Sequence, residues 1–454
     1  MSNRGAIRRH GVDRISGLPD HLLSHILSNL PTKKVVTTSI LSKRWRKLWR
    51  AMPFLDIDLG DFNDDFATFV SFASSFLENS NERCLDKLKL SFEREDVYLS
   101  SSVLSWVQEV VKREIQHLEV IFDSVDSVDM MLKLYLCETL VSLKLQNVWL
   151  ECFEIVSLPN LKVMHLVENL YGCDDTMKNL ISSCPVLEDL TIVKLVAEVT
   201  AKVLQVSSPS LNSLKLLVDH GDGSYTDDSD DWKVIIDAPQ LTYLSLHDHQ
   251  SAGFVISKMD SSAKVEINVA FNVEDIENIE DIENIDDSFE RSAVHKLLTS
   301  LSSVRDMTLS GTTLKIMRHY MKHESMPQFR NMKQLYVKLY ICDLEILPGV
   351  LECCPNLKSL VVKLNKVMER EEISFSSVPK CLQSSLEYVE IKRTKYGNGV
   401  EMKLSKYFLE NSLVLEKFTL CRRFLSKEQE SLVVKGLKAF NKGSSAAQVN
   451  VVVL

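Results

Sequence analysis

Residues 354–365 read CPNLKSLVVKLN, a proline turn followed by apolar residues that alternate with polar ones. Leu357, Leu360 and Val362 take the first, fourth and sixth places of a short pattern that ends at Asn365. This alternation predicts a short strand with one buried face, because successive side chains of a strand point to opposite faces. One such strand cannot bury its own apolar face, so the stretch predicts similar neighbours stacked beside it.

The same apolar-x-x-apolar-x-apolar pattern recurs along residues 85–420, with successive starts mostly 21 to 30 residues apart. Copies begin at Leu85, Leu118 (shorter), Leu140, Leu161, Leu187, Leu211, Leu241, Val304, Met332, Leu357, Leu386 and Leu415. The gap between Leu241 and Val304 predicts a degenerate copy near Val265, Ile267 and Val269. Pattern and spacing are typical of a leucine-rich repeat, and the array is irregular because most copies lack the Asn.

A proline stands before several predicted strands and ends the preceding segment. The pairs are Cys184-Pro185, Ser208-Pro209, Ala238-Pro239 and Cys354-Pro355, with Leu158-Pro159 similar. We interpret the cysteines as small buried hydrophobes. The alternative is metal or redox chemistry at Cys353 and Cys354, but no second ligand set has matching spacing.

Composition and charge narrow the class of protein. Of the 454 residues, 45% are apolar and 25% charged, which is typical of a folded globular chain. No apolar run approaches the ~20 residues of a membrane span, and no secretory leader is expected. The ten cysteines contain no CxxC pair. These features predict a protein of the nucleus and/or cytoplasm, with no membrane partner.

The net charge of −9 is unevenly distributed. Residues 1–50 hold eleven Lys and Arg against two Asp, which predicts an acidic partner for this segment. Residues 273–290 hold nine acidic residues and no base, and we interpret 272–290 as a surface insertion. No basic face runs along the repeats, so nucleic-acid binding is not expected.

Residues 13–50 read DRISGLPDHLLSHILSNLPTKKVVTTSILSKRWRKLWR and predict three short helices. Pro19 and Pro31 bound the first helix, Thr32 is expected to cap the second, and the third is expected to begin near Ser39. The predicted apolar stripes are Leu22, Leu23, Ile26, Leu27 and Leu30 in the first helix, and Leu41, Trp45, Leu48 and Trp49 in the third. So small a unit, without disulfides or metal ligands, usually needs a partner. The alternative is that it packs on the rest of the chain.

This segment resembles the F-box, in its plant version, through Leu18-Pro19, Leu30-Pro31 and the run Ser42 to Arg46 with Leu48-Trp49. The resemblance implies docking on a Skp-family adaptor and, through it, on a cullin–RING ubiquitin ligase. By this resemblance, nine residues are candidates for the adaptor interface or for its support: Leu18, Pro19, Ile26, Leu27, Leu30, Pro31, Val35, Trp45 and Trp49. The motif does not separate residues that touch the partner from residues of the helical core.

The C-terminal segment resembles the FBD domain of plant F-box/leucine-rich-repeat proteins. The matching residues are 378–382 (VPKCL), 407–411 (YFLEN) and 415–417 (LEK). Its pattern predicts strands near 386–392, 415–420 and 446–453 and helices near 401–411 and 427–440. One expectation is that this module hides the last edge of the repeat sheet.

The predicted fold is mixed α/β: a three-helix F-box, an irregular leucine-rich-repeat solenoid and a C-terminal α+β FBD cap. The predicted division is a disordered N-terminus at 1–12, the F-box at 13–55, a linker with a capping helix at 56–84, repeats at 85–375 and the FBD domain at 376–454. The apolar helix expected within 61–80 is assigned to cover the open end of the array.

These features predict a non-catalytic substrate-recognition subunit of a cullin–RING ubiquitin ligase, whose repeats bind an unknown target protein. No catalytic residue, cofactor or metal ligand is predicted. His247-Asp248-His249 is interpreted as a surface turn, and the acidic loop 219–231 lacks the Gly and Glu spacing of an EF-hand. The alternatives are a repeat scaffold outside ubiquitination and an enzyme such as a cysteine hydrolase, which requires a reactive cysteine of low pKa.

Overall fold

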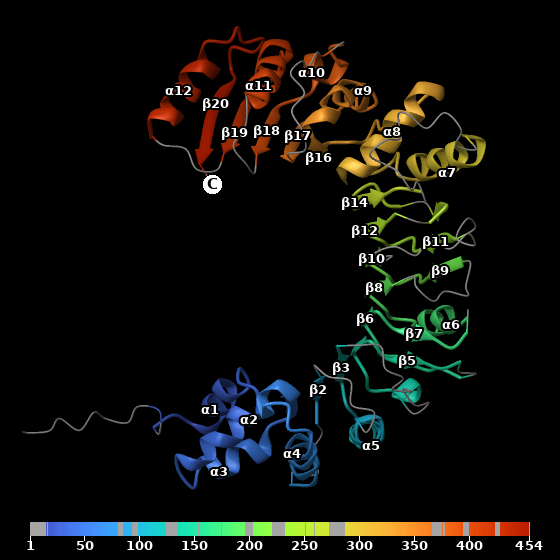
Figure 1. Ribbon diagram of the computed structural model, residues 1–454, viewed down its shortest axis with the longest axis vertical. Helices are drawn as coiled ribbons and strands as arrows, with labels where there is room; N and C mark the ends of the chain where they lie inside the picture. The colour runs from blue at the N-terminus through green and yellow to red at the C-terminus, as the bar shows by residue number, and fades with distance from the viewer. Residues whose placement is uncertain are drawn as a thin grey trace, which may run out of the picture. The chain divides into compact units, whose positions relative to one another are not determined.

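The computed structural model describes residues 15, 17–79, 85–92, 99–123, 134–152, 155–173, 175–195, 203–219, 232–249, 251–257, 259–271, 287–365, 375, 377–393, 399–422 and 427–453. The expected N-terminus at 1–12 and most of the acidic stretches 219–231 and 272–290 lie outside these residues. The chain divides into two compact units (Figure 1). Unit 1 comprises residues 1–161 and 168–172, and unit 2 comprises residues 162–167 and 173–454.

Unit 1 joins short helices to the first strands of a parallel sheet, in the order β1-β2-β3-β4. Its helical elements are α1 (Asp20–Leu27), α2 (Thr32–Thr37), η1 (Thr38–Ile40), α3 (Trp45–Leu48), η2 (Trp49–Ala51), η3 (Leu59–Phe62), α4 (Phe66–Asn79), α5 (Leu99–Lys112) and η4 (Leu134–Leu136). Its strands are β1 (Phe54–Asp58), β2 (Lys87–Phe92), β3 (His117–Phe122), β4 (Ser142–Gln146), β5 (Trp149–Leu150) and β7 (Leu170–Tyr171).

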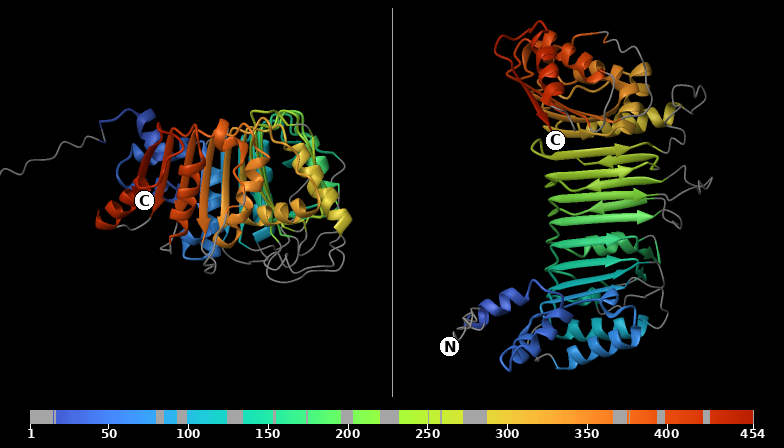
Figure 2. Two further views of the ribbon diagram at one scale, coloured as in Figure 1. Left: turned by 90° about the horizontal axis from the view of Figure 1, so that it is seen from above. Right: turned by 60° about the vertical axis from the view of Figure 1, so that its left-hand side comes forward.

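Unit 2 extends a parallel sheet in the order β6-β8-β10-β12-β14-β15-β16-β17-β18-β19-β20. The strands are β6 (Val163–Val167), β8 (Asp189–Leu195), β10 (Ser213–Asp219), β12 (Tyr243–Asp248), β14 (Lys264–Val269), β15 (Asp306–Leu309), β16 (Gln334–Tyr340), β17 (Ser359–Asn365), β18 (Tyr388–Arg393), β19 (Lys417–Arg422) and β20 (Gln448–Val453). The helical elements are α6 (Thr176–Ser182), α7 (Asp287–Ser300), α8 (Gly311–His323), η6 (Ile341–Ile346), α9 (Leu347–Glu352), α10 (Lys380–Ser384), α11 (Val400–Asn411) and α12 (Lys427–Lys438). The right-hand view of Figure 2 shows the green and yellow strands of this sheet side by side.

The repeat pattern reproduces the strands of the sheet. In β17 burial alternates along the strand, so that Leu360, Val362 and Leu364 are buried and Val361 and Lys363 lie on the open face. The degenerate copy is confirmed as β14, with Val265 and Ile267 buried. The leucine-rich-repeat prediction therefore holds, because one apolar face of each strand is covered by the return segments.

The first strand appears earlier than the pattern indicated. β1 follows the helical unit directly and pairs in parallel with β2, with Leu55 beside Leu88. Leu55 and Ile57 are buried, which gives β1 the same alternation as a repeat strand. Met52, Leu55 and Ile57 fit the same apolar-x-x-apolar-x-apolar pattern, so the array begins one copy before Leu85.

Backbone hydrogen bonds at the strand entrances repeat from one unit of the array to the next. The carbonyl oxygens of Lys333, Lys358, Glu387 and Glu416 accept bonds of 2.8–3.1 Å from the first residue of the next strand or from the residue immediately before it. Before them, the amides of Leu187 and Leu357 donate to the carbonyls of Cys184 and Cys354 at 3.2 Å and close the proline turns. Pro185 and Pro355 therefore lie in the turns that precede β8 and β17.

Three return segments are strands rather than the expected helices or turns. β9 (Val203–Ser207), β11 (Lys233–Asp237) and β13 (Gly253–Ile256) form a second parallel sheet in the order β13-β11-β9. α6 packs against β9 and α7 against β13, so the small sheet lies between two helices of the return layer. Burial alternates along β11: Val234 and Ile236 are buried, and Lys233, Ile235 and Asp237 are not, which favours a strand over a helix at this point.

The C-terminal segment contains the predicted strands and helices as β18, α11, β19, α12 and β20. Its strands pair in parallel with β17 and with one another, so they continue the repeat sheet. The expectation that this module hides the last edge is wrong for the described residues, because β20 is last in the strand order. Val452 and Val453 are 40% and 43% exposed.

Asn169 is a buried polar residue of unit 1 whose side chain bonds to two backbone groups. The side-chain amide of Asn169 donates to the carbonyl of Leu145 at 2.9 Å, and its oxygen accepts from the amide of Val148 at 3.0 Å. Asn169→Ala leaves both backbone groups unpaired, and each costs about 1–3 kcal/mol when buried. We expect faster hydrogen exchange at the Val148 amide and a lower urea midpoint.

Asn160→Ala is the matched control, because exposed Asn160 makes one side-chain bond, of 2.7 Å, to the carbonyl of Glu138. It should lower the urea midpoint much less. Equal effects of the two substitutions would contradict a role for burial.

Candidate functional site

The N-terminal helices of unit 1 enclose a small apolar core. Its members are Leu23, Leu27, Val35, Trp45, Leu48 and Met52, each at most 6% exposed. Leu22 and Ile26, predicted to share the stripe of Leu23 and Leu27, are instead 42% and 46% exposed. The stripe divides because Leu22 and Ile26 lie one turn apart on the flank of α1, beyond the width of the core.

The third predicted helix differs from its expected extent. It begins as α3 at Trp45, after the η1 turn, and not near Ser39. Leu41 therefore leaves the predicted stripe and is 62% exposed, while its neighbour Ile40 is 83% exposed. Thr32 does not cap α2; its hydroxyl accepts the amide of Asp56 at 2.8 Å and links α2 to β1.

The nine predicted adaptor-site residues fall into three groups by exposure. Leu27, Val35 and Trp45 are buried in the core. Leu18, Leu30 and Trp49 are half-buried and pack against it. Pro19, Ile26 and Pro31 are exposed. The structure thus brings six of the nine together in and around one core, and leaves three accessible to a partner.

Four further large apolar side chains are exposed within residues 15–51: Ile15, Leu22, Ile40 and Leu41, of which Ile15 is 56% exposed. These four residues are not among the nine predicted adaptor-site residues. Adjacent Leu22 and Leu23 lie about 100° apart around the helix, so only a wide core could bury both. Exposed apolar residues gathered on a unit of this size indicate an interaction surface.

Arg44 explains why the motif pairs a basic run with Leu18-Pro19. Its guanidinium donates to the Asp20 carboxylate at 2.7 Å and to the carbonyl of Leu18 at 2.5 Å. Asp20 lies in the first turn of α1, where a negative charge is favourable. Arg44 thereby fixes the start of α1, and with it the orientation of Leu22 and Ile26.

The N-terminal helices also contact α4 and η3 of unit 1. The Trp49 ring lies 5.6 Å from that of Phe76 in α4, and the Lys33 ammonium lies 4.2 Å from the centre of the Phe62 ring. Trp49 therefore joins the helices to α4, which makes it a supporting residue. Among the described residues, the N-terminal helices therefore pack in part on the rest of the chain.

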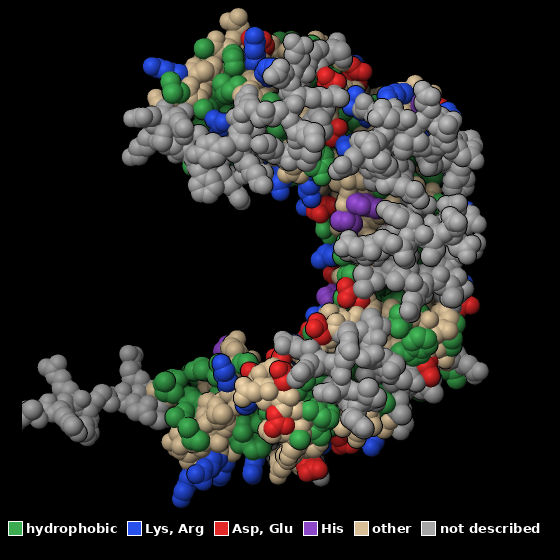
Figure 3. Space-filling view, viewed as in Figure 1, with side chains coloured by type: hydrophobic (Ala, Val, Ile, Leu, Met, Phe, Trp, Pro, Cys, Tyr) green, Lys and Arg blue, Asp and Glu red, His purple; other side chains and the backbone are tan. Residues whose placement is uncertain are grey.

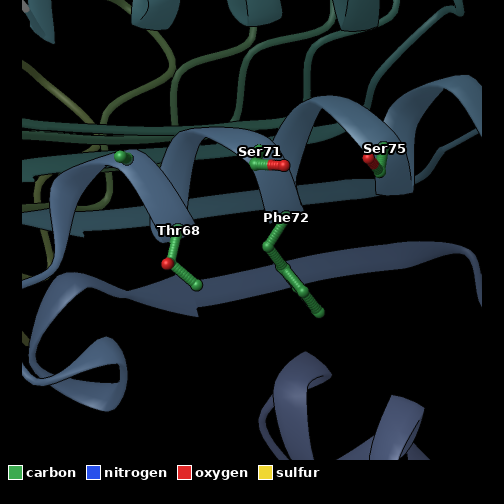
Figure 4. A pocket seen from close by; sticks show the side chains of 5 residues that line it. Thr68, Ser71, Phe72 and Ser75 are labelled. Atoms are coloured by element: carbon green, nitrogen blue, oxygen red, sulfur yellow. The ribbon is translucent and has the colours of Figure 1, made fainter.

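One hollow of about 510 Å³ lies along α4 (Figure 4). Its lining residues all belong to that helix: Ala67, Thr68, Ser71, Phe72 and Ser75. The hollow is open, and the lining holds no ionisable side chain. It offers no arrangement for chemistry.

The remaining charged groups of the N-terminal helices are exposed. Lys43, Arg46, Lys47 and Arg50 lie on or beside α3 and are all exposed. Figure 3 shows Lys and Arg side chains gathered beside α3. This surface is complementary to an acidic partner.

The open face of the unit 2 sheet is polar and mixed in charge. Figure 3 shows acidic, basic and histidine side chains along its strands. His247 and His249 stack at 5.2 Å, and Asn268 contacts the His247 ring at 3.0 Å. The described residues contain no group of three or more His, Cys, Asp or Glu arranged to hold a metal ion.

Six of the eight described cysteines are buried. Burial raises the pKa of the Cys184 and Cys381 thiols to about 12 and that of Cys353 to about 11, and it raises the pKa of Cys354. A nucleophilic cysteine requires the opposite shift. These four thiols therefore give no support to a cysteine hydrolase. No helix among the described residues is long and apolar enough to cross a membrane.

Comparison with known proteins identifies each part of the chain. The F-box domain model matches residues 15–56, and the FBD model matches residues 373–420. Residues 103–310 match the leucine-rich-repeat model described as the LRR repeats of FBD-associated F-box protein At5g56370. These matches fall on the helical unit, on the stacked strands and on the segment that contains β18, α11 and β19.

Whole proteins of Arabidopsis thaliana match over nearly the full chain. F-box/FBD/LRR-repeat protein At5g22660 is 63% identical over 100% of this chain and 99% of its own length. F-box/FBD/LRR-repeat protein At5g22700 is 56% identical, and F-box/LRR-repeat protein 13 is 41% identical, each over 96% of both chains. The chain belongs to the plant F-box/FBD/leucine-rich-repeat family.

Cysteine reactivity gives a direct check of the core assignment. In the native protein, we expect a maleimide to modify exposed Cys152 well before Cys184, Cys353 or Cys381, because burial and the raised pKa suppress their thiolates. Peptide mapping by mass spectrometry measures the order of labelling, with unfolded protein as the control. Rapid labelling of Cys184 in the native state would contradict the assignment.

Proposed function

We propose that this protein is the substrate-recognition subunit of a cullin–RING ubiquitin ligase. In this proposal the F-box helices dock on a Skp-family adaptor, and the open face of the repeat sheet binds a target protein. The membership of the family supports the first part, and the polar, uncovered face of the sheet supports the second. The site of action is the nucleus and/or the cytoplasm.

The observation that carries the proposal is the division of α1 into two faces. Leu23 and Leu27 are 0% and 1% exposed and fill the core, while Leu22 and Ile26 remain accessible one turn apart. An apolar pair of this kind, held on a helix anchored by Arg44, matches the way an amphipathic helix presents itself to a partner's groove. Ile40 and Leu41 extend the apolar surface available on the same unit.

The protein's contribution to ubiquitination is proximity in this proposal. Holding a target beside an activated ubiquitin raises the effective concentration of the reacting groups, without an acid, base or nucleophile from this chain. The transfer chemistry belongs to a separate conjugating enzyme. We therefore assign no catalytic residue.

The decisive experiment exchanges the exposed pair for charges. Leu22→Asp/Ile26→Asp should weaken adaptor binding by about 30-fold or more, since a charge is then placed against an apolar anchor worth roughly 2 kcal/mol or more. Thermal unfolding should change little, because both side chains are already exposed. Binding is measured by calorimetry with the purified adaptor.

The matched control is Leu413→Asp/Leu432→Asp, which alters two apolar residues of unit 2 that are 55% and 68% exposed. It should leave adaptor binding unchanged. Full adaptor binding by the α1 variant would refute the proposed interface. Capture of adaptor without cullin by the wild type would instead favour a scaffold outside ubiquitination.

A further inference from the structure

Three lysines occupy one lateral row on the open face of unit 2. Lys338 of β16 is in register with Lys363 of β17, and Lys363 is in register with Lys392 of β18. Neighbouring strands lie about 4.8 Å apart, so the three α-carbons span roughly 10 Å. We call these residues the lysine row.

Several other lysines of unit 2 meet an acidic group of the neighbouring repeat. Lys162 pairs with Glu188 at 2.8 Å and Lys358 with Glu387 at 2.7 Å. Lys264 of β14 is in register with Asp306 of β15. Opposite charges stabilise adjacent strands, and like charges side by side destabilise them. The lysine row departs from this arrangement.

The row is only partly neutralised within the described residues. Lys392 pairs with Glu390 at 3.3 Å, while Lys338 and Lys363 have no ion pair there. Lys338 is exposed and Lys363 is half-buried. On the same strand faces, β16 to β18 carry one carboxylate, Glu390, against three ammonium groups.

Two tyrosines lie beside the row and add no negative charge to it. Tyr336 and Tyr340 flank Lys338 on the same face of β16, because side chains two apart share a face. The Lys392 ammonium lies 5.9 Å from the centre of the Tyr336 ring, and that of Lys315 in α8 lies 5.6 Å from the Tyr340 ring. A fourth cation therefore adjoins the end of the row.

We propose that the lysine row binds an extended acidic segment of the target protein. Alternate side chains of an extended peptide recur every ~6.8 Å, so two carboxylates on one side of it fit over three lysines. A single phosphate is served better by the planar fork of arginine, which the row lacks. This inference rests on the proposed function and specifies the chemistry of the target.

The test uses the full-length chain and a fluorescent peptide of alternating Glu and Ser. Lys338→Gln/Lys363→Gln should weaken binding of this peptide at least about tenfold in anisotropy titrations. The wild-type interaction should weaken as salt increases, because exposed charges are screened. A Gln-for-Glu version of the peptide should not bind.

The matched control removes the same charge elsewhere on the face. Lys215→Gln/Lys417→Gln, at two exposed lysines of β10 and β19, should change the affinity less than about twofold. Equal weakening by both pairs, or no binding by the wild type, would overturn the proposal. So would tighter binding of a phosphoserine peptide with the same net charge.

Two further measurements separate the alternatives. Lys363→Gln alone should raise the midpoint of thermal unfolding at low salt, and raise it less at high salt, because it relieves repulsion among the lysines of the row. A lower midpoint would contradict the repulsion. A variant with Gln and Asn in place of Glu and Asp at 274–286 tests the chain's own acidic stretch. If this variant bound the peptide and the wild type did not, that stretch would be the occupant of the row.

Adaptor binding is measured in parallel. Loss of adaptor binding would count against the proposed function, whereas a failure of peptide binding with adaptor binding retained would count against the lysine row alone.

Discussion

The burial of each strand's apolar face by the next turn of the chain is the constraint on which the structure depends. No repeat strand has enough apolar surface to be stable alone, and the array is held by register between neighbours. Leu360 of β17 lies beside Leu335 of β16 and Val389 of β18, and all three are at most 2% exposed. One face of every strand is committed to the core, which leaves the other free to vary.

The same constraint explains the helical unit at the start of the chain. Its core has six residues and is joined to the rest of unit 1 through the contacts of Trp49 with Phe76 and of Thr32 with Asp56. Leu22, Ile26, Ile40 and Leu41 of the same helical segment stay exposed. Its buried contacts fix the helices on the rest of unit 1, and its exposed apolar residues are available to a partner.

The sequence predicted the strands well because their apolar positions alternate and the prolines mark their starts. It predicted the degenerate copy at β14 for the same reason. It did not predict the return strands β9, β11 and β13, whose identity depends on packing between α6 and α7. In the candidate site, periodicity identified the apolar residues of α1 but did not divide them. The boundary between Leu23 and Leu22 is set by the width of the core, a tertiary property.

The lysine row was also invisible in the sequence, because Lys338, Lys363 and Lys392 are separated by whole repeats and only the strand register aligns them. Register acts equally at the far end of unit 2. β20 carries four valines and neither lysine nor proline, and its outer edge is unpaired among the described residues. Such an edge is a template for another extended chain. Recombinant protein stripped of its partners is therefore most vulnerable to aggregation at its C-terminal strand, where added lysines would improve solubility.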